Sequence, residues 1–347
     1  MKRKKIKRIV FGSIAAVLVL VGLAFGFDAY HFFLSNFKSL DGQQHGIYVY
    51  PDTPLDSVLN LVGESYQISS AAAFRRACRK ENFTTPLPGY YEFGNIISNR
   101  QLVRRLRDGR ETPVRLSWTN SVRTREQLAK RLAEQLMLDS ATIAGCLGSD
   151  AYMESYALNR ETAVCLFIPN TYEVYWSMSV DQLFDRMFVE YNRFWTDQRL
   201  QRAENIGFTP TEVATLASIV ESETNRTAEH PIIAGLYINR LHKGMPLQAC
   251  PTVIFANGDF SVRRVQGDML RINSPYNTYR FRGLPPGPIR CPNGKTIDAV
   301  LNYDHNDYLY MCANPDFSGN HKFSRTYAEH AATARQYQRE LNKRNIN

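Results

Sequence analysis

The sequence lacks the short motifs of the common metal- and nucleotide-dependent enzymes. Its seven histidines form no H-E-x-x-H pair, its six cysteines form no C-x-x-C pair, and no G-x-S-x-G is present. These absences argue against the usual zinc sites and against a nucleophile elbow. The segment "NGKT" resembles the end of a P-loop, but Ile289 stands where that loop needs its first glycine. We therefore expect no metal and no nucleotide cofactor.

Acidic residues are missing from the first 27 positions, and the rest of the chain has little net charge. The first eight residues hold six of the 42 Lys and Arg residues, which leaves 36 basic against 33 acidic residues in the remainder. Nucleic-acid binding depends on a basic surface in the folded part of a protein. We therefore expect no nucleic acid among the partners.

The basic start is followed by 19 uncharged residues, Ile9 to Phe27. A membrane core of about 30 Å needs about 20 such residues in a helix. Basic residues favour the cytoplasmic side, so we expect a cytoplasmic tail at 1–8, an anchor at 9–28 in the inner membrane, and the remainder outside. The alternative is a signal peptide cleaved after Gly26. A lipobox is excluded because no cysteine precedes Cys78.

The sequence after the anchor predicts an α+β protein with two parts. Residues 29–45 are typical of a connector, and strand–helix–strand patterning predicts a small module at 46–112. The longer part, 113–347, mixes amphipathic helices with strand-like aromatic segments. Its most clearly marked helix lies within 208–224, where a Thr-x-x-Glu capping box is expected from Thr209 and Glu212, with Pro210 in the first turn.

Two glutamates, Glu221 and Glu223, stand at the end of this helix in the segment "ASIVESET". At about 100° per residue they flank a broad apolar arc on opposite sides, so they cannot form a same-face carboxylate pair. One interpretation is an acid/base catalyst whose pKa is raised by apolar neighbours. The other is a pair of helix-end carboxylates that bind neighbouring loops. The residues alone leave both open.

The six cysteines are scattered, and their even count permits disulfides in an exported protein. Three of them, Cys250, Cys291 and Cys312, fall in the segment that holds most of the polar motifs. We expect Cys250 to pair with one of the other two. The remaining cysteines are typical of small buried apolar residues.

Several segments after Leu87 resemble, in order and spacing, the endolytic murein transglycosylases of the YceG-like family. They are "PGYYEF", "FIPNTYEVY", "ASIVESET", "YINRLHKGMPLQACPTVIFA", "SPYNTYRFRGLPPGPI", "AVLNYDHNDYLYM" and "HKFSRTYAEH". The resemblance implies a LysM-like module and a catalytic domain on a single-pass anchor that faces the cell wall. It further implies cleavage of the MurNAc–GlcNAc bond of peptidoglycan with formation of 1,6-anhydro ends, in the release or termination of nascent strands.

By resemblance, Glu221 aligns with the catalytic glutamate and Glu223 takes a supporting role. Amide and hydroxyl groups in the same motifs suit sugar hydroxyls, and the resemblance assigns substrate binding to Gln248, Thr252, Asn277 and Tyr279. Many family members carry Asp where this chain has Cys250, which puts a second carboxylate role in doubt here.

Two other functions remain compatible with the sequence. The first is a glycan hydrolase on the same fold, with Glu223 or another acid activating water. The second is a non-catalytic scaffold that binds the wall and docks peptidoglycan synthases through its LysM-like module.

Overall fold

The computed structural model describes residues 2–119, 121–262 and 264–344, with side chains from Val10 onward. The side chains of the expected cytoplasmic tail therefore lie outside the described residues. The chain forms two compact units. Unit 1 extends to Arg115 and includes Glu173–Met178, and unit 2 comprises Leu116–Tyr172 and the chain from Ser179. The chain passes between them within two paired strands, β6 (Val114–Ser117) and β7 (Thr171–Val174).

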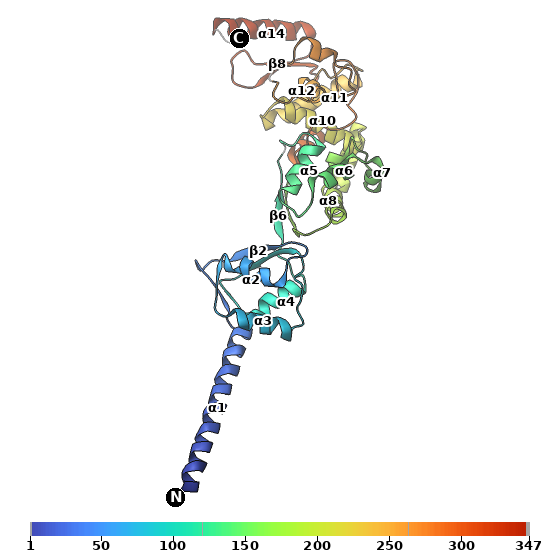
Figure 1. Cartoon of the computed structure of the whole chain (residues 1–347). Helices are drawn as coiled ribbons and strands as arrows, with labels where there is room; N and C mark the ends of the chain where they lie inside the picture. The colour runs from blue at the N-terminus through green and yellow to red at the C-terminus, as the bar shows by residue number, and fades with distance from the viewer. Residues whose placement is uncertain (1, 120, 263, 345–347) are drawn as a thin grey trace. The chain divides into compact units, whose positions relative to one another are not determined.

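The first helix, α1 (Lys2–Phe33), is the one helix in the described part of the chain that is long and apolar enough to cross a membrane. Its 24 residues Val10–Phe33 have a mean hydropathy of 2.5, and no side chain of the most apolar window is buried. The apolar N-terminal helix expected from the sequence is thus present, and it continues past residue 28 (Figure 1). At its end Phe32 is buried beneath Lys80, whose Nζ lies 4.3 Å from the ring centre.

The rest of unit 1 combines short helices with two small antiparallel sheets, one ordered β3-β1-β5 and one formed by β2 and β4. Within the expected connector, Phe37 pairs with Ile68 and Ile97, so this segment contributes a strand. The elements are β1 (Phe37–Ser39), β2 (His45–Val49), α2 (Leu55–Gly63), β3 (Tyr66–Ile68), α3 (Ala71–Lys80), β4 (Gly89–Phe93), β5 (Ile96–Ile97) and α4 (Asn99–Arg107).

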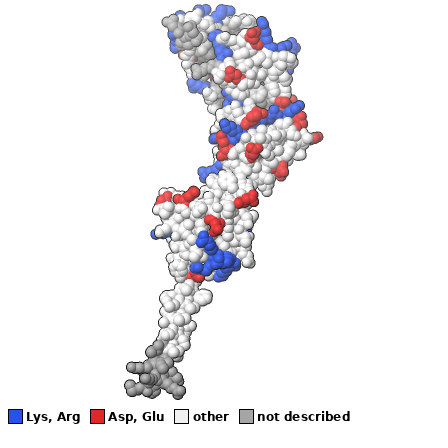
Figure 2. Space-filling model, viewed as in Figure 1, with Lys and Arg blue, Asp and Glu red and all other residues white. Residues whose placement is uncertain are grey.

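The core of unit 1 forms where these helices cover the sheets. Helix α4 buries Leu102, Val103 and Leu106 completely, and a Ser98–Gln101 capping box begins the helix. The opposite faces of α3 and α4 are basic, and Figure 2 shows Lys and Arg side chains gathered over this part of the unit.

Unit 2 is largely helical. Its helices are α5 (Arg125–Ala133), α6 (Ser140–Gly148), α7 (Asp150–Met153), α8 (Val180–Phe194), α9 (Asp197–Ile206), α10 (Pro210–Glu223), α11 (His230–His242), α12 (Cys250–Asn257), α13 (Gly294–Leu301) and α14 (Tyr327–Lys343). Short 3-10 turns are η1 (Glu154–Tyr156), η2 (Ala163–Leu166), η3 (Thr227–Glu229) and η4 (Gly267–Arg271), and an antiparallel hairpin consists of β8 (Tyr310–Ala313) and β9 (His321–Ser324).

Helix α10 forms the centre of the main core of unit 2. It packs against α9, α11, α12 and α13, and its apolar arc is completely buried, as at Leu216, Ile219 and Val220. The predicted capping box is confirmed: Thr209 Oγ1 accepts from the Glu212 N–H, and Glu212 Oε2 accepts from the Thr209 N–H. Helix α10 is therefore capped at its start and buried from Val213 to Glu221 within a mixed α+β fold.

Candidate functional site

A pocket of about 210 Å³ opens at the C-terminal end of α10, where Glu223 is the last residue of the helix. Its walls come from α11, from the start of α12, and from the β8–β9 hairpin. The lining residues are Glu223, Leu236, Tyr237, Arg240, Leu247, Gln248, Cys250, Tyr279, Met311, Cys312, Ala313 and His321. Segments nearly 100 residues apart in sequence therefore meet around one carboxyl group.

The Glu223 carboxyl group is partly buried, and burial raises its pKa above the ordinary value of 4.5. Three neighbours oppose the shift: the hydroxyl of Tyr237, which donates to Glu223 Oε1 over 2.5 Å, and the charges of His321 and Arg240. Burial dominates, so the carboxyl group holds its proton to a higher pH than an exposed glutamate.

Arg240 supplies a fixed positive charge beside this carboxyl group. Its guanidinium donates to the carbonyl oxygens of Leu309 over 2.6 Å, Leu247 over 2.7 Å and Pro246 over 3.3 Å. Burial lowers its pKa, yet arginine remains charged in proteins. The side chain thus joins three carbonyl groups, and its charge lowers the pKa of Glu223.

His321 faces the pocket from β9 and is oriented by Glu229. Glu229 accepts from the His321 backbone N–H over 2.6 Å, and its other oxygen lies 2.8 Å from His321 Nδ1. Burial raises the pKa of Glu229, but these contacts outweigh burial and lower the pKa overall. This arrangement leaves Nε2 as the ring nitrogen of His321 that remains for a ligand.

Glu221 lies on the other side of α10 and does not line this pocket. It is 7% exposed, and its Oε2 accepts from the backbone N–H of Asn293 over 2.9 Å. Asn293 caps α13, so the carboxyl group of Glu221 lies at the positive end of that helix. Arg290 donates to the backbone oxygen of Glu221. These contacts join α10 to the start of α13.

The four expected substrate-binding residues divide into two groups. Gln248 and Tyr279 line the pocket, and Gln248 has a left-handed φ of 51°, a strained conformation of the kind found at functional sites. Thr252 and Asn277 are completely buried outside the lining. Thr252 Oγ1 donates to the Ala249 carbonyl over 2.7 Å.

The side chain of Asn277 is also buried and forms its hydrogen bonds with the backbone. Its side-chain amide donates to the carbonyls of Leu270 and Ile272, and its oxygen accepts from the N–H of Tyr279 over 3.1 Å. Asn277 therefore shapes the loop that presents Tyr279, while its own polar atoms are occupied.

The expected disulfide of Cys250 is not formed, and all six cysteines are free. Cys250 Sγ instead lies 3.1 Å from the hydroxyl of Tyr279. Cys291 is buried with its backbone N–H donated to Val122, and Cys312 lies across the pocket on β8. The expectation of a disulfide was therefore wrong. Cys250 and Cys312 both line the pocket, but their thiols form no bond, and Cys291 is buried outside the pocket lining.

The sequence interpretation missed Tyr237, Arg240, Glu229 and His321. The first two stand three residues apart in the quoted segment "YINR", which places them on one face of α11. Of the described residues, no three His, Cys, Asp or Glu side chains gather as around a metal ion. The groups at the pocket can donate and accept protons and hydrogen bonds.

The fold and the pocket thus define a mixed α+β protein with a partly buried acid among sugar-compatible polar groups. The family profile described as YceG-like matches residues 47–336. The chain belongs to the YceG-like family.

Relatives and a solved structure agree with this membership. An endolytic murein transglycosylase of Bacillus subtilis (strain 168) is 40% identical over 126 residues, which cover 36% of this chain and 34% of that protein. One from Streptococcus pneumoniae serotype 2 is 25% identical over 336 residues, 87% of this chain and 61% of its own. The matched regions thus span about one third and three fifths of these relatives. A crystal structure of a yceG-like protein from Listeria monocytogenes shares 25% identity at a TM-score of 0.55, covering 84% of this chain and 98% of that one.

Proposed function

We propose that this chain is an endolytic lytic transglycosylase that cleaves the MurNAc–GlcNAc bond of peptidoglycan and leaves 1,6-anhydro-MurNAc ends. The observation that carries the proposal is the Glu223 carboxyl group, whose pKa is raised in a pocket lined by Gln248, Tyr279 and His321. Family membership and the relatives named endolytic murein transglycosylases support the substrate.

We place the acid/base role on Glu223 instead of Glu221. Glu223 faces the pocket, whereas Glu221 accepts the Asn293 N–H at the start of α13. The resemblance had favoured Glu221, and the helix periodicity chose neither. We assign Glu221 a structural role and give Gln248 and Tyr279 contact with the sugar. Thr252 and Asn277 hold the backbone of the segments that carry these two residues.

One carboxyl group is sufficient for the proposed reaction. Glu223 first donates its proton to the glycosidic oxygen as the bond to the muramic sugar breaks. The C6 hydroxyl of that sugar then attacks C1, and the Glu223 carboxylate takes the hydroxyl proton, which restores the acid. Because nucleophile and electrophile belong to one sugar, the attack is intramolecular and needs no bound water.

A hydrolase is the second candidate, and the pocket argues against it. Glycosidases that use water or a covalent intermediate commonly need two carboxylates. Of the described residues that line the pocket, Glu223 is the only carboxylate. Mass spectrometry of digested sacculi separates the two reactions: anhydro ends support the proposal, and reducing ends would identify a hydrolase. Binding without any product would favour a scaffold.

We also propose how the anchor, the module and the catalytic domain are arranged along the chain. Residues 1–8 form a cytoplasmic tail, α1 anchors the chain through residues 9–28, 29–45 connect, 46–112 form a LysM-like module, and 113–347 form the catalytic domain outside the cytoplasmic membrane. The apolar α1 and the basic start of the sequence support this orientation. Peptidoglycan synthases are the proposed partners in releasing or terminating strands. N-terminal sequencing of the mature protein tests the anchor, since a chain that begins at Phe27 would show cleavage.

A further inference from the structure

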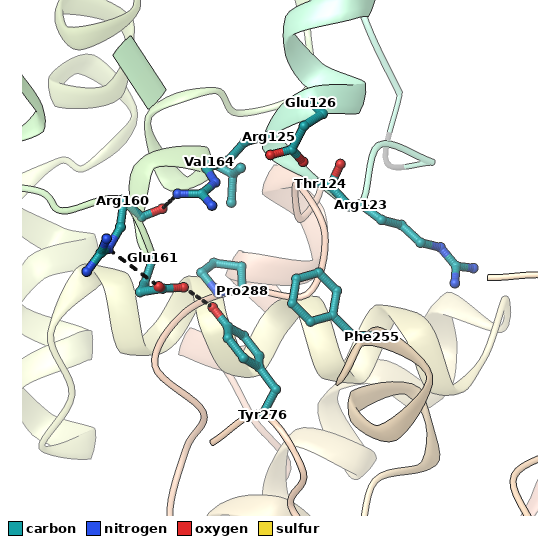
Figure 3. A pocket seen from close by; sticks show the side chains of 10 residues that line it. All are labelled: Arg123, Thr124, Arg125, Glu126, Arg160, Glu161, Val164, Phe255, Tyr276 and Pro288. Carbon is teal, nitrogen blue, oxygen red and sulfur yellow. Dashed lines mark hydrogen bonds and ion pairs between the residues drawn. The ribbon is translucent and has the colours of Figure 1, made fainter. Parts of the chain in front are cut away.

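A second pocket in unit 2 is rich in arginine (Figure 3). It encloses about 180 Å³ and forms where the start of α5 meets the segment around Glu161 and the "LPPGP" turn at 284–288. The lining residues are Arg123, Thr124, Arg125, Glu126, Arg160, Glu161, Val164, Phe255, Tyr276 and Pro288.

The carboxyl group of Glu161 in this pocket is already occupied. Its Oε2 accepts from the hydroxyl of Tyr276 over 2.9 Å, and its Oε1 lies 3.9 Å from Nε of Arg160 (Figure 3). A Cβ on Gly287 would come within 2.0 Å of the Glu161 carbonyl oxygen, so only glycine permits this close approach. The wall formed by Glu161 and the "LPPGP" turn is therefore rigid.

Arg123 and Arg125 differ from Arg160 in their partners. Within the described ranges, neither of the two forms an ion pair with a carboxylate. Arg125 donates to the backbone oxygen of Arg160 over 3.2 Å, and Arg123 lies 4.9 Å from the ring centre of Phe260. Both side chains are only partly exposed. Their guanidinium groups retain donors suited to a planar anion.

The arginine pocket and the Glu223 pocket share two chain segments. Helix α12 begins with Cys250 in the Glu223 pocket and reaches Phe255 in the arginine pocket. Five residues of helix advance about 8 Å. The segment of Tyr276 and Tyr279 also reaches both pockets. Tyr279 lines the Glu223 pocket, and Tyr276 lines the arginine pocket. A polymer cleaved at Glu223 can therefore present a neighbouring substituent to the arginine pocket.

We propose that Arg123 and Arg125 form a subsite for a carboxylate of the peptide stem carried by the glycan strand. This inference rests on the proposed function and adds a substrate requirement to it. The guanidinium group of Arg125 binds the carboxylate, the guanidinium group of Arg123 adds positive charge on the opposite side of the pocket (Figure 3), and the rings of Phe255 and Tyr276 contact the aliphatic part of the stem. Stems recur along the strand, as an enzyme that cuts internally needs, whereas a lipid-linked pyrophosphate occurs only at one end.

The test compares two glycan preparations, one with intact stems and one stripped by an amidase. We expect Arg123→Gln combined with Arg125→Gln to reduce kcat/KM on stem-bearing strands by about 10- to 100-fold, as for charged hydrogen bonds, and to leave stripped strands unaffected. Arg131→Gln is the matched control, because Arg131 lies on α5 as Arg125 does but pairs with Glu134 outside this pocket.

Binding measured in the Glu223→Gln background keeps the test independent of turnover. There the double arginine variant should weaken binding of stem-bearing strands alone. Three results would overturn the subsite. The double variant could affect both preparations equally, or affect neither. Its loss of binding could also follow a lipid-linked end instead of the stems. A wild-type protein that forms no anhydro ends from either preparation would instead contradict the proposed function, and the binding arm would still decide the subsite.

Discussion

The hydroxyl of Tyr237 donates a hydrogen bond to Oε1 of Glu223 over 2.5 Å, and the two residues come from adjacent helices. Burial raises the pKa of both groups. The bond itself favours the Glu223 carboxylate and so limits the upward shift of its pKa. Helix α11 therefore controls how readily the last residue of α10 gives up its proton.

Replacement of Tyr237 by Phe tests this control. The variant loses a contact that lowers the pKa of Glu223, so that pKa should rise further. Since the reaction begins with protonated Glu223, the alkaline limb of the kcat/KM profile should move to higher pH. A profile measured from about pH 4 to 9 covers this limb. A limb that stays in place or moves to lower pH would show that Tyr237 does not tune the acid.

The pH dependence of stability gives a second test of the same group. A carboxyl group with a raised folded-state pKa contributes stability that is complete below its unfolded value and is lost as pH rises through the folded value. Glu223→Gln removes this loss because glutamine does not titrate. Its Tm should therefore exceed that of the wild type at neutral pH, and the difference should disappear below about pH 4.5.

Glu221→Gln is the control for that measurement. It keeps an acceptor for the Asn293 N–H but lies outside the pocket. A pH-dependent gain in Tm that appears in this variant and not in Glu223→Gln would contradict the account.

Ser218 links α10 to the "LPPGP" turn. Its Oγ accepts from the buried N–H of Ile289 over 3.0 Å and donates to the Thr215 carbonyl over 2.7 Å. Ser218→Ala leaves the Ile289 N–H without this acceptor, which should cost about 1–3 kcal/mol in urea unfolding. Ser222→Ala is the matched control, because Ser222 accepts no buried backbone N–H in the described residues. Similar losses in both variants would argue against the link.

The state of the cysteines is directly measurable. All six thiols should react after unfolding without reductant. In the native protein the exposed Cys250 should react first, and the buried Cys78, Cys165 and Cys291 last. A count of four thiols after unfolding would restore the disulfide that the sequence suggested.

Local features of α10 could be predicted from the sequence, because they depend on neighbouring residues. The capping box, the proline in the first turn and the buried apolar arc all follow from spacing within one helix. The resemblance of several segments to one family could also be recognised from the sequence. The apolar N-terminal helix followed from its length and lack of charge.

The environment of the two glutamates could not be predicted in this way. Glu223 is distinguished by Tyr237 and His321, which approach it only in the folded chain. Glu221 is distinguished by Asn293 at the start of α13. Likewise, Thr252 and Asn277 carry the same polar groups as a sugar-binding residue, and only their buried hydrogen bonds show that those groups are occupied.

The most direct test of the central claim is the yield of anhydro-muropeptides from sacculi treated with wild-type, Glu223→Gln and Glu221→Gln proteins. Both substitutions keep the shape of the side chain. We expect that Glu223→Gln forms no anhydro ends while still binding glycan strands, and that Glu221→Gln retains activity to the extent that it stays folded. Anhydro ends from Glu223→Gln at a near wild-type rate, or a folded but inactive Glu221→Gln beside an active Glu223→Gln, would contradict it.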